Sequence, residues 1–175
     1  MCAYSDFIVY YDEQYIYQAV VIDPPEFKGT RKTGNLVPFE FSVSIRPFKE
    51  NRLGRLPIQL NSTPFKITNE QKYPSKPLIK LTGSGDASFF VNEEEFKLKA
   101  LDKELIIDSF LEESYRVLDG KIEHQDHVTT FLDFPELKPG ENTLTWTNRI
   151  KSFELTPRWK RGDKLPAGAV ITYNE

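Results

Sequence analysis

The chain has 175 residues, of which 39% are hydrophobic, 13% aromatic and 28% charged. This length allows one domain or two small ones with a core of their own, and the composition is that of an ordinary folded protein rather than a disordered chain. The single cysteine, Cys2, excludes an intramolecular disulfide and a multi-cysteine zinc site. No apolar run approaches the roughly 20 residues that span a bilayer, and residues 1–27 contain no Lys or Arg for a secretory signal.

The net charge of -3 hides a segmental pattern. Residues 28–80 carry eleven basic and three acidic side chains, whereas residues 81–145 carry six basic and fifteen acidic ones. Such blocks either steer complementary copies or partners together or form ordinary solvated faces, and the sequence leaves both readings open. The overall acidity argues against a nucleic-acid partner, including for the basic stretch 46–55, which contains only one aromatic residue.

The first part of the chain contains two strand patterns. Residues 15–22 are rich in aromatic and β-branched side chains and are stopped by Asp23-Pro24-Pro25, which predicts a largely buried strand. In residues 37–46 every odd position is apolar, which predicts a half-buried strand. Shorter extended pieces follow at 56–60 and 64–67, and prolines at 74 and 77 bracket a linker.

The rest of the chain reads as a series of short strands. We expect strands at 78–82, 88–91, 95–100, 105–108, 128–132, 143–147 and 150–156, with turns at 83–86, 92–93, 118–120 and 138–142. Seven such segments predict an antiparallel β-sandwich, so the fold class is mainly β. The expected divisions are a β-rich domain and connector at 1–72, the sandwich at 73–161 and a C-terminal tail at 162–175.

One segment has a second reading. Ile107, Phe110, Leu111 and Tyr115 recur at helical spacing, so residues 102–115 fit either an amphipathic helix or a strand followed by a loop. Short apolar runs do not decide between these two by periodicity alone.

Signals for chemistry are weak throughout. The only histidines, His124 and His127, lie in a polar segment after a glycine turn, which favours a solvated loop over a metal site. Neither a nucleophile elbow nor a phosphate-binding glycine loop is present. We therefore predict no catalytic, metal or cofactor-binding residue and no cofactor. Trp146 and Trp159 fit core packing, with carbohydrate stacking as the alternative.

The segments 107–109 and 133–142, then Trp146 and the segment 157–159, resemble in their order and spacing the C-terminal domain of siphophage distal tail proteins, which are components of the phage tail-tip hub. Upstream, residues 10–20, 39–41 and 47–49 are similar to the closing strands of the N-terminal domain in that family, so the resemblance covers about 6–161. The motif residues of the C-terminal part, for which we expect structural roles, are Ile107, Asp108, Ser109, Asp133, Phe134, Pro135, Leu137, Pro139, Gly140, Asn142, Trp146, Pro157, Arg158 and Trp159.

The resemblance implies a structural protein rather than an enzyme. It implies an N-terminal domain that forms a hexameric ring at the end of the tail tube and a galectin-like C-terminal β-sandwich. The implied partners are other tail-tip proteins of a phage or prophage: the tail tube, the tail-associated lysin or fibre, and the receptor-binding protein. The implied location is the virion tail, assembled in the bacterial host cytoplasm. The family brings no cofactor and no catalytic residue.

Only a few residues precede Tyr10-Tyr11, whereas family members usually begin with a larger part of the ring domain. We therefore expect residues 1–72 to be a shortened ring-type domain, forming a monomer, a small homo-oligomer or a co-assembly with a full-length distal tail protein. Two other functions stay open. One is a truncated hub mimic that interferes with tail assembly, and the other is a carbohydrate-binding sandwich module with a host glycan as partner.

Overall fold

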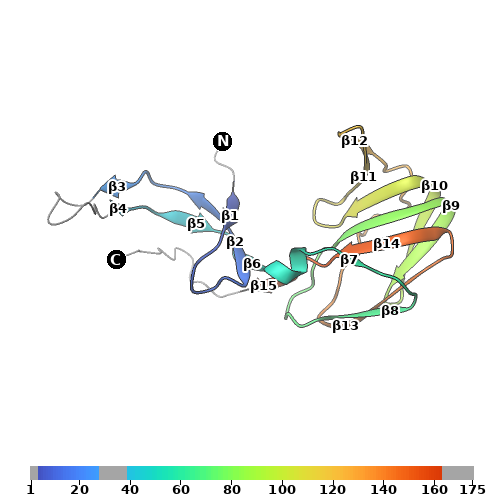
Figure 1. Cartoon of the computed structure of the whole chain (residues 1–175), viewed down its shortest axis with the longest axis horizontal. Helices are drawn as coiled ribbons and strands as arrows, with labels where there is room; N and C mark the ends of the chain where they lie inside the picture. Colours follow the sequence, from blue (N-terminus) through green and yellow to red (C-terminus); the bar gives the residue numbers. More distant parts are fainter. Residues whose placement is uncertain (1–3, 28–38, 163–175) are drawn as a thin grey trace. The chain divides into compact units, whose positions relative to one another are not determined.

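The computed structural model describes residues 4–27 and 39–162 and is mainly β, as the sequence predicted (Figure 1). The chain divides into two compact units, one built from 1–49 with 162–175 and the other from Glu50–Arg161. Two strands contain the points where the chain passes between the units, namely β6 (Phe48–Asn51) and β15 (Lys160–Gly162). Residues 37–38 and the tail from 163 onward lie outside the described residues.

The first unit is organised around β2 (Tyr15–Val21), which confirms the strand expected there. β2 lies between β1 (Ser5–Phe7) and β5 (Val43–Ile45), and both pairings are antiparallel. A separate pair joins β3 (Glu26–Phe27) to β4 (Phe39–Glu40). The single strand expected at 37–46 is therefore wrong: the described part is two strands, because the chain changes its pairing partner from β3 to β2 at residues 41–42.

The second unit contains one short 3-10 helix, η1 (Arg52–Arg55), and eight strands. The strands are β7 (Ile58–Gln59), β8 (Phe65–Asn69), β9 (Leu78–Val91), β10 (Glu94–Asp108), β11 (Glu113–Leu118), β12 (Lys121–His124), β13 (Gly140–Trp146) and β14 (Ile150–Thr156).

β9 and β10 form one long hairpin rather than four short strands. The turn at Asn92 was expected and is present, with Asn92 in the left-handed region at φ 59°. The turn expected at 83–86 is wrong, because β9 runs through it unbroken. Gly83 fits there for a different reason: a side-chain Cβ on it would lie 2.5 Å from the Arg149 carbonyl oxygen. A register shift lies between Leu98 and Leu101 of β10, opposite Ala87 and Gly85 of β9.

β9 changes its neighbour along its length, and this change builds the sandwich. Near its start β9 pairs with β14, and near its end it pairs with β13, which in turn pairs with β8. Figure 1 shows β8 and β13 below β9, β10 and β14 in this view. Inward-facing side chains of both layers fill one core, whose fully buried members are Ile79, Leu81, Phe89, Phe96, Leu98, Leu105, Ile107, Leu137, Leu144, Phe153 and Leu155.

The ambiguous segment 102–115 is a strand, not a helix. β10 continues to Asp108, a turn follows, and β11 begins at Glu113. A second hairpin joins β11 to β12 at the expected turn, where Asp119 (φ 50°) and Gly120 (φ 75°) are both left-handed. No strand forms at 128–132; only Thr129 makes an isolated bridge, to Leu98.

The boundary between the units comes earlier than the expected division at 72/73. β7 pairs with β14 and β8 pairs with β13, so residues 58–69 complete the second unit. Their short extended pieces carry too few residues to reveal these distant partners. Among the described residues no helix is long and apolar enough to cross a membrane.

Candidate functional site

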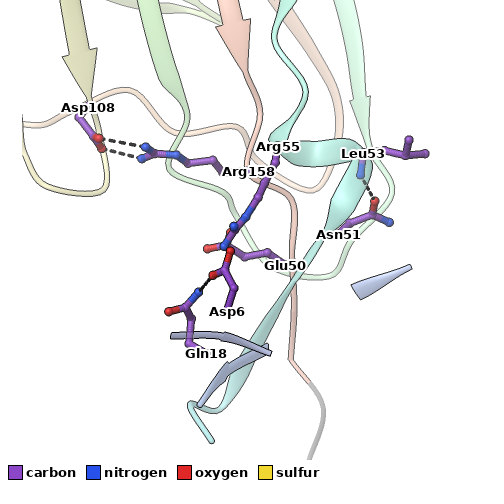
Figure 2. A network of polar contacts seen from close by, with 8 residues as sticks. All are labelled: Asp6, Gln18, Glu50, Asn51, Leu53, Arg55, Asp108 and Arg158. Carbon is purple, nitrogen blue, oxygen red and sulfur yellow. Dashed lines mark hydrogen bonds and ion pairs between the residues drawn. The ribbon is translucent and has the colours of Figure 1, made fainter. Parts of the chain in front are cut away.

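The best-formed polar cluster joins the end of β10 to the segment after β14 (Figure 2). The Arg158 guanidinium donates two hydrogen bonds to the Asp108 carboxylate, at 2.6 and 3.0 Å. Asp108 Oδ1 also accepts from the backbone N–H groups of Phe110 and Leu111, at 3.0 and 3.1 Å. Asp108 is 3% exposed, so this is a buried, two-pronged ion pair with its acceptors occupied.

The backbone around Arg158 is fixed as tightly as its side chain. Arg158 is left-handed (φ 54°), and its N–H donates to the Gly54 carbonyl at 2.6 Å. The next residue, Trp159, accepts from the Asn51 N–H at 2.9 Å. A Cβ on Gly54 would lie 2.6 Å from the Trp159 nitrogen, so glycine is what allows this approach. Residues 158–159 are thereby attached to η1 at the start of the unit.

Electrostatics of this cluster favour a fixed charge rather than a reactive one. Burial raises the pKa of Asp108, but hydrogen bonds from Arg158 and from two backbone N–H groups outweigh it and leave the pKa below its ordinary value. Nearby, burial lowers the pKa of Lys160, whose ammonium lies 4.6 Å from the centre of the Phe110 ring. Because the Asp108 carboxylate is ionised and fully hydrogen-bonded, it holds two segments of the chain together and is poorly suited to transferring protons.

A second cluster holds the turn before β13. Asn142 is completely buried and bridges this turn, accepting from the Lys138 N–H and donating to the carbonyls of Lys138 and Gly140. Asn92 reaches across from the β9–β10 turn, donating to Asn142 and accepting from the Thr143 N–H at 3.0 Å. Gly140 supplies the left-handed φ of 91° that the turn needs. The two turns are therefore locked to each other.

The other motif residues fall into three groups. Ile107, Leu137, Pro135 and Pro157 are buried, and Phe134, Trp146 and Trp159 are half-buried against the core. Asp133 and Pro139 are exposed. The hydroxyl of Ser109 is buried without a hydrogen-bond partner. The structure thus brings Asp108 and Arg158 into direct contact and places Asp133 at the surface.

Trp146 packs as a core residue rather than presenting a binding face. Its ring centre lies 5.0 Å from that of the fully buried Phe153. A groove of about 440 Å³ lies beside β9 and β10, lined by charged, hydroxyl and amide side chains such as Lys97, Lys99 and Arg149. No aromatic side chain lines this groove, so it offers no surface for sugar stacking.

His124 and His127 are both exposed. The loop expected there is present only at His127, because His124 is the last residue of β12 and pairs with Tyr115. Within the described ranges, 4–27 and 39–162, no three His, Cys, Asp or Glu side chains are grouped as a metal site would require.

Sequence reasoning missed a buried lysine in the first unit. Lys49 is 6% exposed, and its ammonium lies 2.5 Å from Asp12 Oδ2 and 3.1 Å from the Tyr17 hydroxyl. It also lies 4.3 Å from the centre of the Tyr15 ring, a cation–π distance. Burial, with the hydrogen bond to Asp12, raises the pKa of Tyr17. The sequence around Lys49 gave no signal of this burial, because lysine side chains are mostly exposed in folded proteins.

No protein-family model matches the sequence, and no curated protein matches it. Among solved structures, the chain is similar to the crystal structure of the SPP1 Dit protein, described as a paradigm of the hub adsorption apparatus in phages that infect Gram-positive bacteria. The TM-score is 0.61 at 10% sequence identity, over 91% of this chain. The chain has the Dit fold.

The likeness to Dit confirms the sequence-based resemblance at the level of the fold. It also agrees with the mainly β architecture predicted from alternation and turn signals. The chain spans 65% of the length of the SPP1 Dit structure. The galectin-like assignment of the sandwich and the roles of the motif residues stay predictions.

Proposed function

We propose that this chain is a structural protein of a phage or prophage tail tip, which joins the tail tube to the baseplate or host-recognition apparatus through protein–protein contacts. The observation that carries the proposal is the Dit fold over 91% of the chain, because the SPP1 Dit protein is described as a hub of the adsorption apparatus. Fold alone does not define function, so the proposal also needs a site that fits it.

The clusters of the second unit fit a mechanical role. Asp108 with Arg158, and Asn92 with Asn142, fasten turns and strand ends that are far apart in the sequence. A sandwich fastened in this way presents rigid edges and loops to its neighbours, which suits a protein that holds others in register. The proposed partners are the tail tube, the tail-associated lysin or fibre, and the receptor-binding protein.

The direct test is the composition of purified tails. Particles from the phage or prophage that encodes the chain should contain it at a fixed ratio to the tail-tube protein, measured by quantitative mass spectrometry, and gold-labelled antibodies should mark the tip. A host cytoplasmic protein of similar size serves as the contamination control. If the chain never exceeds that control, the structural role is wrong.

The two other functions predicted from the sequence give different results. A hub mimic would be absent from tails and would lower the yield of tailed particles when overproduced during infection. A carbohydrate-binding module would bind a glycan array and change Trp fluorescence with host cell-wall polysaccharide. We expect neither result, and the packing of Trp146 on Phe153 argues against the carbohydrate-binding module.

A further inference from the structure

We propose that the free edge of β12 pairs with the same edge of a second copy of this chain, joining the sheets of the two copies into one continuous sheet across a two-fold axis. β12 is the last strand in the order of its sheet and pairs only with β11 among the described residues. Figure 1 shows the β11–β12 hairpin at the border of the second unit. This inference stands independently of the proposed function.

The register of the hairpin determines which backbone groups face outward. Leu118 and Lys121 flank a two-residue turn, so they form a hydrogen-bonded pair. Such pairs alternate along an antiparallel ladder, and the Gln125 N–H accordingly donates to the Ser114 carbonyl at 2.7 Å. Between these positions, the N–H and C=O of Ile122 must therefore point away from β11, toward the free edge.

An antiparallel copy fits this edge when Ile122 lies on the two-fold axis. Ile122 then exchanges two backbone hydrogen bonds with its own symmetry mate, the arrangement expected of a self-complementary interface. By the same alternation His124 also has outward groups. A shift of one residue would turn the facing backbone groups away from each other. The register centred on Glu123 would keep the hydrogen bonds but would set the two Glu123 carboxylates against each other, so the register with Ile122 on the axis is favoured.

The side chains in this register are also complementary. Val117 lies opposite Ile122 within the hairpin, and the two are 48% and 62% exposed. Pairing would align Val117, Ile122 and their two mates in one apolar row across four strands, which removes apolar surface from water.

The opposite face of the strand carries matching charges. Lys121 would lie directly across from Glu123 of the other copy, and the reverse pair forms by symmetry. Lys121 has no ion-pair partner among the described residues, while Glu123 already accepts from Arg116 at 2.8 Å and keeps a side chain that is 42% exposed. Opposite charges in directly facing positions stabilise a strand pair, whereas like charges destabilise it.

Disulfide trapping in the full chain tests the axis. In a Cys2→Ser background, Ile122→Cys should cross-link to its mate under mild oxidation, because hydrogen-bonded antiparallel pairs hold their Cα atoms about 5.5 Å apart, within the range a disulfide spans. Leu132→Cys is the matched control, since Leu132 is 95% exposed and lies outside any strand. Cross-linking at 122 no faster than at 132 would overturn the proposal.

Charge exchange gives an independent test. Lys121→Glu and Glu123→Lys should each raise the dimer dissociation constant by about tenfold or more, measured by analytical ultracentrifugation. Mixing the two variants should restore association as a heterodimer, detected by native mass spectrometry, because each acidic edge then faces a basic one. Circular dichroism confirms that each variant is folded. A wild type that is monomeric up to high concentration, or a mixture that shows no heterodimer, would contradict pairing between copies.

Discussion

Asp108 and Arg158 form a two-pronged ion pair within the second unit. The two lie 50 positions apart in the sequence, and their pairing joins the end of β10 to the segment after β14. The carboxylate is almost fully removed from water, whereas the guanidinium side chain keeps 24% exposure. Removing Arg158 therefore leaves a buried carboxylate without its charged partner, which costs more than losing a surface pair.

We expect Arg158→Met to lower the free energy of unfolding by about 3 kcal/mol, because it leaves the Asp108 charge buried with only backbone donors. Urea denaturation followed by Trp fluorescence measures the change. Lys66→Met is the matched control, since its pair with Glu141 is more than half exposed on both sides and should contribute less than about 1 kcal/mol. Equal losses in the two variants would show that burial does not strengthen the Asp108 pair.

The depressed pKa of Asp108 gives this pair a defined pH dependence. Its folded pKa lies below the ordinary 3.8, so the stabilisation is complete above that value and disappears as the pH falls through the folded pKa. The free energy of unfolding of the wild type should therefore fall toward that of Asp108→Asn between about pH 5 and pH 2. Unfolding curves of both proteins across this range measure the difference. A constant difference at all pH values would exclude Asp108 as the titrating group.

Among the secondary-structure elements, the β9–β10 hairpin shows that glycine in a strand-rich chain can mark either a turn or a close approach between backbones. Gly83 and Gly85 lie close together in the sequence with Ser84 and Asp86, a composition typical of turns. In the structure β9 continues through them, and Gly83 lies directly against the Arg149 backbone. The glycines of this segment therefore mark a close approach between two backbones rather than a turn of the chain.

We expect Gly83→Ala to destabilise the second unit by about 2 kcal/mol, because overpacking of this kind displaces backbone. The new methyl group would lie 2.5 Å from the Arg149 carbonyl oxygen and 2.9 Å from Leu101. Thermal unfolding followed by circular dichroism measures the loss. Ser84→Ala, at the exposed neighbouring position, is the control and should change stability little. A neutral Gly83→Ala would mean that β14 moves away from β9 at no cost.

At the scale of the whole molecule, the second unit should fold by itself. Residues 50–161 contain η1, all of β7 to β14 and the Asp108–Arg158 pair. We expect this fragment to unfold in one cooperative transition, measured by calorimetry. A fragment of 76–161 should be clearly less stable or molten, because it lacks β7 and β8 and the Gly54 carbonyl that accepts from Arg158. Two equally stable fragments would restore the boundary expected at 72/73.

Features that depend on neighbours along the chain could be predicted from the amino-acid sequence. Alternation and β-branched content identified β2, β13 and β14, and the left-handed turns at Asn92 and Asp119-Gly120 follow from residue types that tolerate positive φ. The ordered motifs gave the resemblance that the Dit fold then confirmed. Only the tertiary structure decided which strands merge, that 41–42 interrupts a strand, that residues 58–69 belong to the second unit, and that Lys49 is buried beside Asp12. These features depend on partners distant in sequence, and a one-dimensional pattern records the period of a segment but not the segment that covers it.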